Sequence, residues 1–238
     1  MQDKRVTICA CTSRNFIDKD KVAEIAAVLK NNGYEVKITP DLCKLIMQKD
    51  PVMNEIASST LLACYPRAIR SLLDTMSLVP NRVLDIRNEK MSDIFSQLTV
   101  DASSEAEIAV EKENLKQEIA QYPVETGTDA WYPTLDKERC TECGKCHDFC
   151  LFGVYTIADK KVKVVQPQNC KNNCPACARM CPSKAVIFPK YEKSPINGGC
   201  DMEEQFDPQE MDAIYRERLR YRLQERRAGV SLLKDENK

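Results

Sequence analysis

Apolar residues follow two alternating periods in the first hundred residues. Short runs rich in β-branched residues predict strands, at 5–9, 34–39, 60–64 and 82–86. Between them, apolar residues at helical spacing predict helices, at 18–32, 42–56 with a break at Asp50-Pro51, 66–76 and 92–98. Because strands and helices alternate, we expect residues 1–100 to form an α/β domain, a parallel sheet with helices on both faces.

The pattern changes after residue 100. Residues 103–121 are rich in Glu, Ala and Lys and predict a connecting helix, and a linker then runs to residue 132, with Trp131 and Tyr132 expected to pack on the module that follows. In residues 133–190, apolar runs predict a hairpin at 154–165 and a last strand at 186–188, so this module is α+β. Residues 191–238 form a tail, in which Asp207 and Pro208 begin a helix that runs to about residue 227.

Eight of the 13 cysteines stand in two runs of four within the α+β module. The runs are Cys140, Cys143, Cys146, Cys150 and Cys170, Cys174, Cys177, Cys181. This spacing is typical of a protein that holds two cubane iron–sulfur clusters, in which the fourth cysteine of each run binds the other cluster. Cluster I then takes Cys140, Cys143, Cys146 and Cys181, and cluster II takes Cys170, Cys174, Cys177 and Cys150. The alternatives are a disulfide scaffold, which suits small secreted chains, a zinc site, which prefers separated pairs, or ordinary core cysteines.

These residues resemble the bacterial two-cluster ferredoxin module over about a quarter of the chain. The resemblance implies two 4Fe–4S clusters and one-electron transfer. The chain departs from the pattern at two places, since three residues separate Cys170 from Cys174 where two are usual, and Leu151 follows Cys150 where proline is usual. Neither departure removes a ligand. The only histidine, His147, lies between two ligands, and we expect it to be exposed or hydrogen-bonded rather than to bind iron.

Four more cysteines follow the strands of the α/β domain: Cys9, Cys11, Cys43 and Cys64. The carboxyl ends of parallel strands are where open α/β sheets build their sites, so these four thiolates could hold a third cubane. Two alternatives stay open, a redox-active dithiol at Cys9 and Cys11 and buried cysteines that act only as small apolar residues. Cys200 has no assigned role.

The segments ICAC, PDLC and ACYPRAIR around these four cysteines resemble the N-terminal domain of the flavin-containing component of heterodisulfide reductase. That resemblance implies a cluster-binding electron-transfer domain that works beside a flavoprotein. Tyr65 stands where the family usually has serine, and the flavin domain of that family is absent from the chain. The implied partner is therefore a separate flavoprotein or another protein of the heterodisulfide-reductase type.

Composition and charge limit the partners and the cellular location that we expect for this protein. The 238 residues carry a formal charge of −1 and have a pI of about 6.0, so no global field draws the chain to nucleic acid or to a membrane. No apolar run reaches the length of a membrane span, and the N-terminal run predicts a strand rather than a signal peptide. Cytoplasm, where thiols stay reduced, is the expected location. The arginine-rich helix at 207–227 is expected to dock on a larger redox subunit.

We therefore expect an iron–sulfur subunit of an anaerobic oxidoreductase complex, which relays single electrons and is not an enzyme in itself. One rival function is thiol–disulfide chemistry at Cys9 and Cys11, fed with electrons by the ferredoxin clusters. A second rival is an interaction protein whose clusters are only structural.

Overall fold

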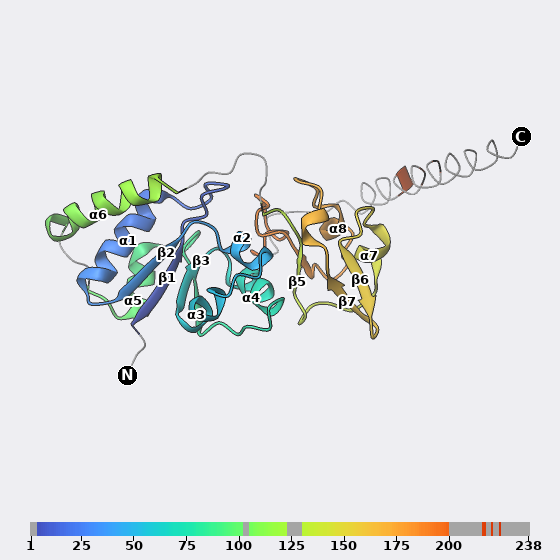
Figure 1. Cartoon of the computed structure of the whole chain (residues 1–238), viewed down its shortest axis with the longest axis horizontal. Coiled ribbons are helices and arrows are strands. Elements are labelled where there is room, and N and C mark those ends of the chain that lie inside the picture. Colours follow the sequence, from blue (N-terminus) through green and yellow to red (C-terminus); the bar gives the residue numbers. More distant parts are fainter. Residues whose placement is uncertain are drawn as a thin grey trace, which may run out of the picture. The chain divides into compact units, whose positions relative to one another are not determined.

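Figure 1 shows the computed structural model of the chain, which describes residues 4–101, 105–122 and 130–199, and residues 216, 217, 220 and 224. Internal contacts divide the chain into two units, Met1–Glu203 and Glu204–Lys238. In the second unit, Arg216, Glu217, Arg220 and Gln224 are helical and exposed. The rest of the helix expected at 207–227, and Cys200, lie outside the described residues.

The first unit is built on a parallel four-stranded sheet. Its strands are β1 (Arg5–Cys9), β2 (Glu35–Thr39), β3 (Thr60–Ala63) and β4 (Arg82–Asp85), in the order β2-β1-β3-β4. Val6 pairs with Val36 on one side and with Thr60 on the other, so β1 is central. All four residues of β3 and the last four of β1 are buried, which explains why these strands are almost wholly apolar. The predicted α/β domain is confirmed.

Helices cover both faces of this sheet, as predicted (Figure 1). They are α1 (Lys19–Asn31), α2 (Leu42–Met47), α3 (Met53–Ser58), α4 (Pro66–Asp74), α5 (Met91–Leu98) and α6 (Glu105–Ala120). Helices α1 and α6 lie together on one side of the sheet, and α2, α3 and α4 lie on the other. The predicted break at Asp50-Pro51 is confirmed, because α2 ends at Met47 and α3 begins at Met53.

Helix α6 adds a layer to the α/β domain. Its apolar residues Ile108, Leu115 and Ile119 are buried in the same core as α1. Three ion pairs join the two helices: Lys112–Glu24, Lys30–Glu111 and Lys116–Asp20. The outer side of α1 is therefore covered, which explains why its run Ala26-Ala27-Val28-Leu29 is buried at every position.

The second part of this unit is a small α+β module. Its strands are β5 (Thr134–Leu135), β6 (Tyr155–Ala158), β7 (Lys161–Val164) and β8 (Val186–Ile187), and its helices are α7 (Lys145–Phe149), the 3-10 helix Pro167–Asn169 and α8 (Ala176–Arg179). The predicted hairpin is β6 and β7, and Asp159 and Lys160 form its turn, both with positive φ. The predicted last strand is confirmed as β8, and it pairs with β5. The sequence did not predict β5, because a strand of two residues shows no periodicity.

Candidate functional site

The cysteines of the α/β domain gather where its strands end. Cys9 is the last residue of β1, Cys64 follows β3 directly, and Cys43 lies in the first turn of α2, just after β2. The chain leaves β1 for β2 on one side and later returns to β3 on the other, so the crevice beside β1 is the switch point of the sheet. The expected placement at the carboxyl edge is thus confirmed, and the thiol-bearing residues are all buried.

Cys11 turns the chain away from β1 in an unusual conformation. Its φ of 48° lies in the left-handed region, which residues other than glycine adopt rarely. Its carbonyl accepts hydrogen bonds from the backbone N–H groups of Arg14 and Asn15, which closes the turn. Such strain is kept where the surroundings require it, most often at functional sites.

The four thiols influence one another. Burial is the largest cause that raises the pKa of each thiol, and the pKa of Cys64 is raised to about 12. The neighbouring Cys11 raises the pKa of Cys9, Cys43 and Cys64 further. Cys11 therefore acts on each of the other three, and these four buried residues at the strand ends are called here the N-terminal cysteine site.

A lysine from the α+β module completes this site. Lys190 lies beyond β8, and its side chain is only 2% exposed. Its Nζ donates to Asp41 Oδ2, to Ser13 Oγ at 2.5 Å and to Cys11 Sγ at 3.9 Å. Burial works to lower the pKa of Lys190, but the facing thiols of Cys43 and Cys11 and the carboxylate of Asp41 raise it overall. Lys190 therefore carries its positive charge inside the protein.

Sequence reasoning missed Lys190 and Asp41. Lys190 stands in a stretch whose polar composition resembles an exposed loop, whereas Ser194, Ile196 and Asn197 in the same stretch are fully buried. Asp41 carried one usable signal, because an aspartate before a helical run predicts an N-cap, and its carboxylate accepts from Cys43 N and Lys44 N. That signal says nothing of the lysine that Asp41 also pairs with.

The second group of cysteines lies on the loops and short helices of the α+β module. Gly144, with φ of 73°, starts α7, which carries Cys146, and α8 carries Cys177. Cys146 and Cys177 are buried, and Cys143 is exposed. His147 is exposed and contacts Asp148 through Nδ1 at 3.0 Å, as expected.

The electrostatic neighbours of these thiols cross between the two runs. The pKa of Cys146 is raised to about 12, chiefly by burial and next by Cys181 of the other run. Cys140 raises it by a smaller amount. The pKa of Cys140 is raised by burial first, and among thiols by Cys181 and then Cys143. Cys181, the last cysteine of the second run, therefore acts on Cys140 and Cys146 of the first run.

The converse holds for the other run. The pKa of Cys170 is raised to about 12, chiefly by burial, then by Cys174 and then by Cys150. Burial also raises the pKa of Cys177; the hydrogen bond from Tyr155 lowers it, and Cys170, Cys150 and, last, Cys146 raise it. Cys150, at the end of the first run, therefore lies beside members of the second run.

Hydrogen-bond donors reach sulfur in this module. Tyr155 Oη donates to Cys177 Sγ at 3.1 Å, and the backbone N–H of Ala185 donates to Cys181 Sγ at 3.3 Å. Donors of this kind stabilise negative charge on sulfur, and they tune the potential of an iron–sulfur cluster where one is bound.

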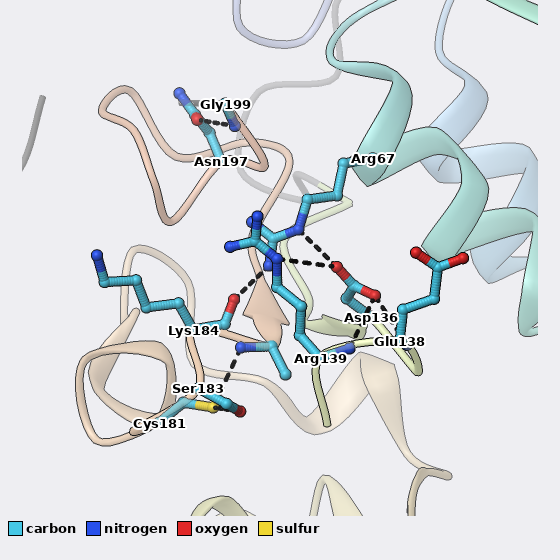
Figure 2. Close-up of polar contacts among 10 residues, drawn as sticks. Arg67, Asp136, Glu138, Arg139, Cys181, Ser183, Lys184, Asn197 and Gly199 are labelled. Atoms are coloured by element: carbon cyan, nitrogen blue, oxygen red, sulfur yellow. Dashed lines mark hydrogen bonds and ion pairs between the residues drawn. The ribbon is translucent and has the colours of Figure 1, made fainter. Parts of the chain in front are cut away.

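Two arginines of the α/β domain contact the loops that carry these cysteines. Figure 2 shows Arg67 of α4, whose Nε donates to Asp136 at 2.6 Å and whose Nη2 donates to the Lys184 carbonyl. Lys184 precedes Ala185, the donor to Cys181. Both side chains of the Arg67–Asp136 ion pair are largely buried.

Arg14 makes the other contact. Its Nη2 donates to Asn173 Oδ1 at 2.6 Å and to Asn172 Oδ1 at 3.4 Å. These asparagines belong to the three residues between Cys170 and Cys174, where two-cluster ferredoxins usually have two. The longer spacer thus reaches the loop that follows Cys11.

The aromatic residues of the linker pack on both parts. Trp131 stacks on Phe188 with ring centroids 5.2 Å apart, which confirms its expected contact with the α+β module. The corresponding expectation for Tyr132 is wrong. Its ring belongs to the core of the α/β domain, and its hydroxyl donates to the Cys43 carbonyl at 2.7 Å.

In the described part of the chain, no three His, Cys, Asp or Glu side chains converge on the position of one metal ion. A cubane would place a different demand on the residues, because each of its four thiolates binds a different iron. Among the same residues, no helix is long and apolar enough to cross a bilayer.

No protein-family model matches this chain. It is 48% identical over 67 residues to a ferredoxin of Methanocaldococcus jannaschii, an alignment that covers 28% of this chain and 45% of that protein, less than half its length. It is 32% identical over 88 residues to Ferredoxin-3 of a Nostoc species, with 28% of this chain and 90% of the relative covered. A second Methanocaldococcus jannaschii ferredoxin is 33% identical over 57 residues, with 23% of this chain and 73% of the relative covered.

Proposed function

We propose, from the premise that this chain belongs to the ferredoxin family of iron–sulfur electron carriers, that its α+β module holds two 4Fe–4S clusters. Cluster I would be bound by Cys140, Cys143, Cys146 and Cys181, and cluster II by Cys150, Cys170, Cys174 and Cys177. The observation that carries this assignment is the spacing of the eight cysteines in two runs. It is supported by Cys181, which raises the pKa of Cys140 and Cys146, and by Cys150, which raises the pKa of Cys170 and Cys177. Such clusters, when bound, exchange one electron at a time.

A third 4Fe–4S cluster at the N-terminal cysteine site is part of the proposal. Its support is the grouping of four buried thiols around Cys11 at the switch point of the sheet, beside a buried cation. The rival function, a reactive dithiol at Cys9 and Cys11, has less support. Reactive cysteines have a lowered pKa and partial exposure, whereas both of these thiols are buried and have a raised pKa.

Contacts within the first unit favour cluster II as the neighbour of the N-terminal cysteine site. Cys170 packs against the core of the α/β domain, and Arg14 bonds the spacer that follows Cys170. By contrast, Cys143 of cluster I is exposed, and so is Ile157, whose side chain lies against Gly144. We therefore propose that electrons pass between the N-terminal site and cluster II, and that cluster I faces an external redox partner.

The setting we propose is a cytoplasmic, anaerobic oxidoreductase complex that resembles heterodisulfide reductase, with this chain as one subunit and a flavoprotein as its partner. Its support is the resemblance of residues 1–100 to the cluster-binding domain of the flavin-containing component of heterodisulfide reductase, together with cysteines that stay reduced in cytoplasm. Within such a complex the chain carries electrons and leaves the bond chemistry to its partner.

Iron analysis and a reductive titration of the anaerobically reconstituted full chain test this function. We expect about twelve iron atoms per chain, four for each cubane, and one-electron signals in electron paramagnetic resonance that broaden through coupling of neighbouring clusters. About eight iron atoms would remove the third cluster from the proposal. Clusters that are not reduced at any point of the titration would contradict electron transfer and would favour a structural role.

Replacing Tyr155 by phenylalanine should lower the potential of cluster II. The hydroxyl of Tyr155 donates to Cys177 Sγ and so stabilises the reduced, more negative form, and its loss removes this stabilisation. We expect a fall of a few tens of millivolts in one midpoint of the titration, with iron content unchanged. Tyr191→Phe, which removes the hydroxyl bonded to Arg179 and no donor to a sulfur described here, is the control and should leave every midpoint in place.

A further inference from the structure

We infer that Lys190 sets the reduction potential of the cluster at the N-terminal cysteine site, as a buried cation that the α+β module supplies to the α/β domain. This inference rests on the third cluster of the proposed function. It goes further by naming a residue outside the ligand set that makes the potential of this site depend on the docking of the two parts.

Position is the first argument. Lys190 follows β8 and is more than a hundred residues away from the cysteines of the site in the sequence. Its Nζ donates hydrogen bonds to Asp41, Ser13 and Cys11. Ser13 also donates to Asp41 Oδ2 at 2.6 Å, so the ammonium group is enclosed by a polar network. The segment that carries it is fixed, because Phe188 N donates to the Ile196 carbonyl and Arg87 donates to the Glu192 carbonyl.

Charge is the second argument. A lysine that is 2% exposed has lost its hydration and must gain an equivalent interaction from the protein. Asp41 provides one negative charge, and it is itself bonded by the backbone at the start of α2. The same ammonium group also contacts Cys11 Sγ at 3.9 Å, so the charge of Lys190 faces a thiol of the site as well as Asp41.

The site has a second cation nearby, Arg87. Its guanidinium lies over the rings of Phe16 and Tyr65, with centroid distances of 4.3 Å and 5.2 Å. Its contacts therefore hold it on the aromatic side of the site. Lys190 is the cation that the described structure places in contact with Cys11 itself.

The direction of the effect follows from charge. Reduction adds one negative charge to the site, so a nearby cation stabilises the reduced form and raises the potential, and a nearby anion lowers it. Loss of the Lys190 charge should therefore lower the potential of this cluster. Loss of the Asp41 charge should raise it.

Two variants of opposite expected sign test the inference, Lys190→Met and Asp41→Asn. Asparagine caps helices as well as aspartate does, so Asp41→Asn keeps the start of α2. In redox titrations of the full chain, we expect the midpoint of the N-terminal cluster to fall in Lys190→Met and to rise in Asp41→Asn. Each shift should reach about a tenfold change in the ratio of reduced to oxidised cluster, which is about 59 mV for one electron. Lys193→Met, an exposed site in the same segment, is the matched control.

The outcomes separate this inference from the proposed function. About eight iron atoms in the wild-type chain would overturn the third cluster and this inference with it. About twelve iron atoms with unmoved midpoints in both variants would overturn the inference alone, as would shifts of the same sign. If Lys190→Met does not retain the third cluster, Asp41→Asn decides alone, and a midpoint that stays or falls contradicts the inference.

Discussion

Replacing Cys181 and Cys140 together by alanine should remove about four iron atoms per chain, no more than either replacement alone removes. The reason is that the proposed cluster I uses both thiols, although they stand in different runs. Cys181 raises the pKa of both Cys140 and Cys146, which supports their assignment to one group. Iron and sulfide analysis after anaerobic reconstitution measures the loss.

The matched double replacement has the opposite outcome. Cys181 and Cys177 stand in the same run, but we assign them to different clusters, so Cys181→Ala with Cys177→Ala should remove about eight iron atoms. If ligands followed the order of the sequence, the two double variants would exchange their results. Cys200→Ala, outside both runs, controls for the loss of any cysteine and should cost no iron.

The second large effect is expected at the ion pair between the α/β domain and the α+β module. Arg67→Met removes the nearer of the two guanidinium partners of the buried Asp136 carboxylate, leaving Arg139 Nε at 3.8 Å, and also removes the donor to the Lys184 carbonyl (Figure 2). Breaking a buried pair on one side costs about 3–5 kcal/mol, so with Arg139 still present we expect the free energy of unfolding to fall by an amount near the lower end of that range. Urea unfolding of the reconstituted protein, followed by the fluorescence of Trp131 and by cluster absorbance, measures it.

Arg70→Met is the control for this prediction. Arg70 lies on the same helix, one turn further on, and is exposed, so its loss should change stability by less than about 0.5 kcal/mol. Equal stability of the two variants would mean that the Arg67–Asp136 pair contributes little. Because Lys184 lies next to the residue that donates to Cys181, Arg67→Met should also hasten the loss of iron from cluster I relative to the control.

Residues close in sequence explain most of what could be predicted. The two runs of cysteines are recognisable because ligands two residues apart reach one cluster from one loop, whatever the rest of the chain does. The strands and helices of the α/β domain follow from apolar periods within each segment. Their alternation also places Cys9, Cys43 and Cys64 at one edge of the sheet, since parallel strands end together.

The missed features join segments that are far apart in the chain. The sequence predicts helix α6 as a connecting helix, but its apolar side covers α1. A helical period identifies an apolar side and does not indicate which surface that side will contact. Tyr132 was expected on the wrong neighbour for the same reason. The spacer of Asn172 and Asn173 was visible as a departure from the ferredoxin pattern, but its contact with Arg14 depends on how the two parts dock.

By itself, the sequence determined the alternating α/β elements, the ferredoxin-type spacing of eight cysteines and the edge at which the other four gather. Each of these depends on chemistry that repeats over a few residues. Only the tertiary structure decided which cation and which anion stand beside the N-terminal thiols. Lys190 and Asp41 meet because a loop after β8 packs against the start of α2, and a buried charge is stable only where folding brings its partner to it.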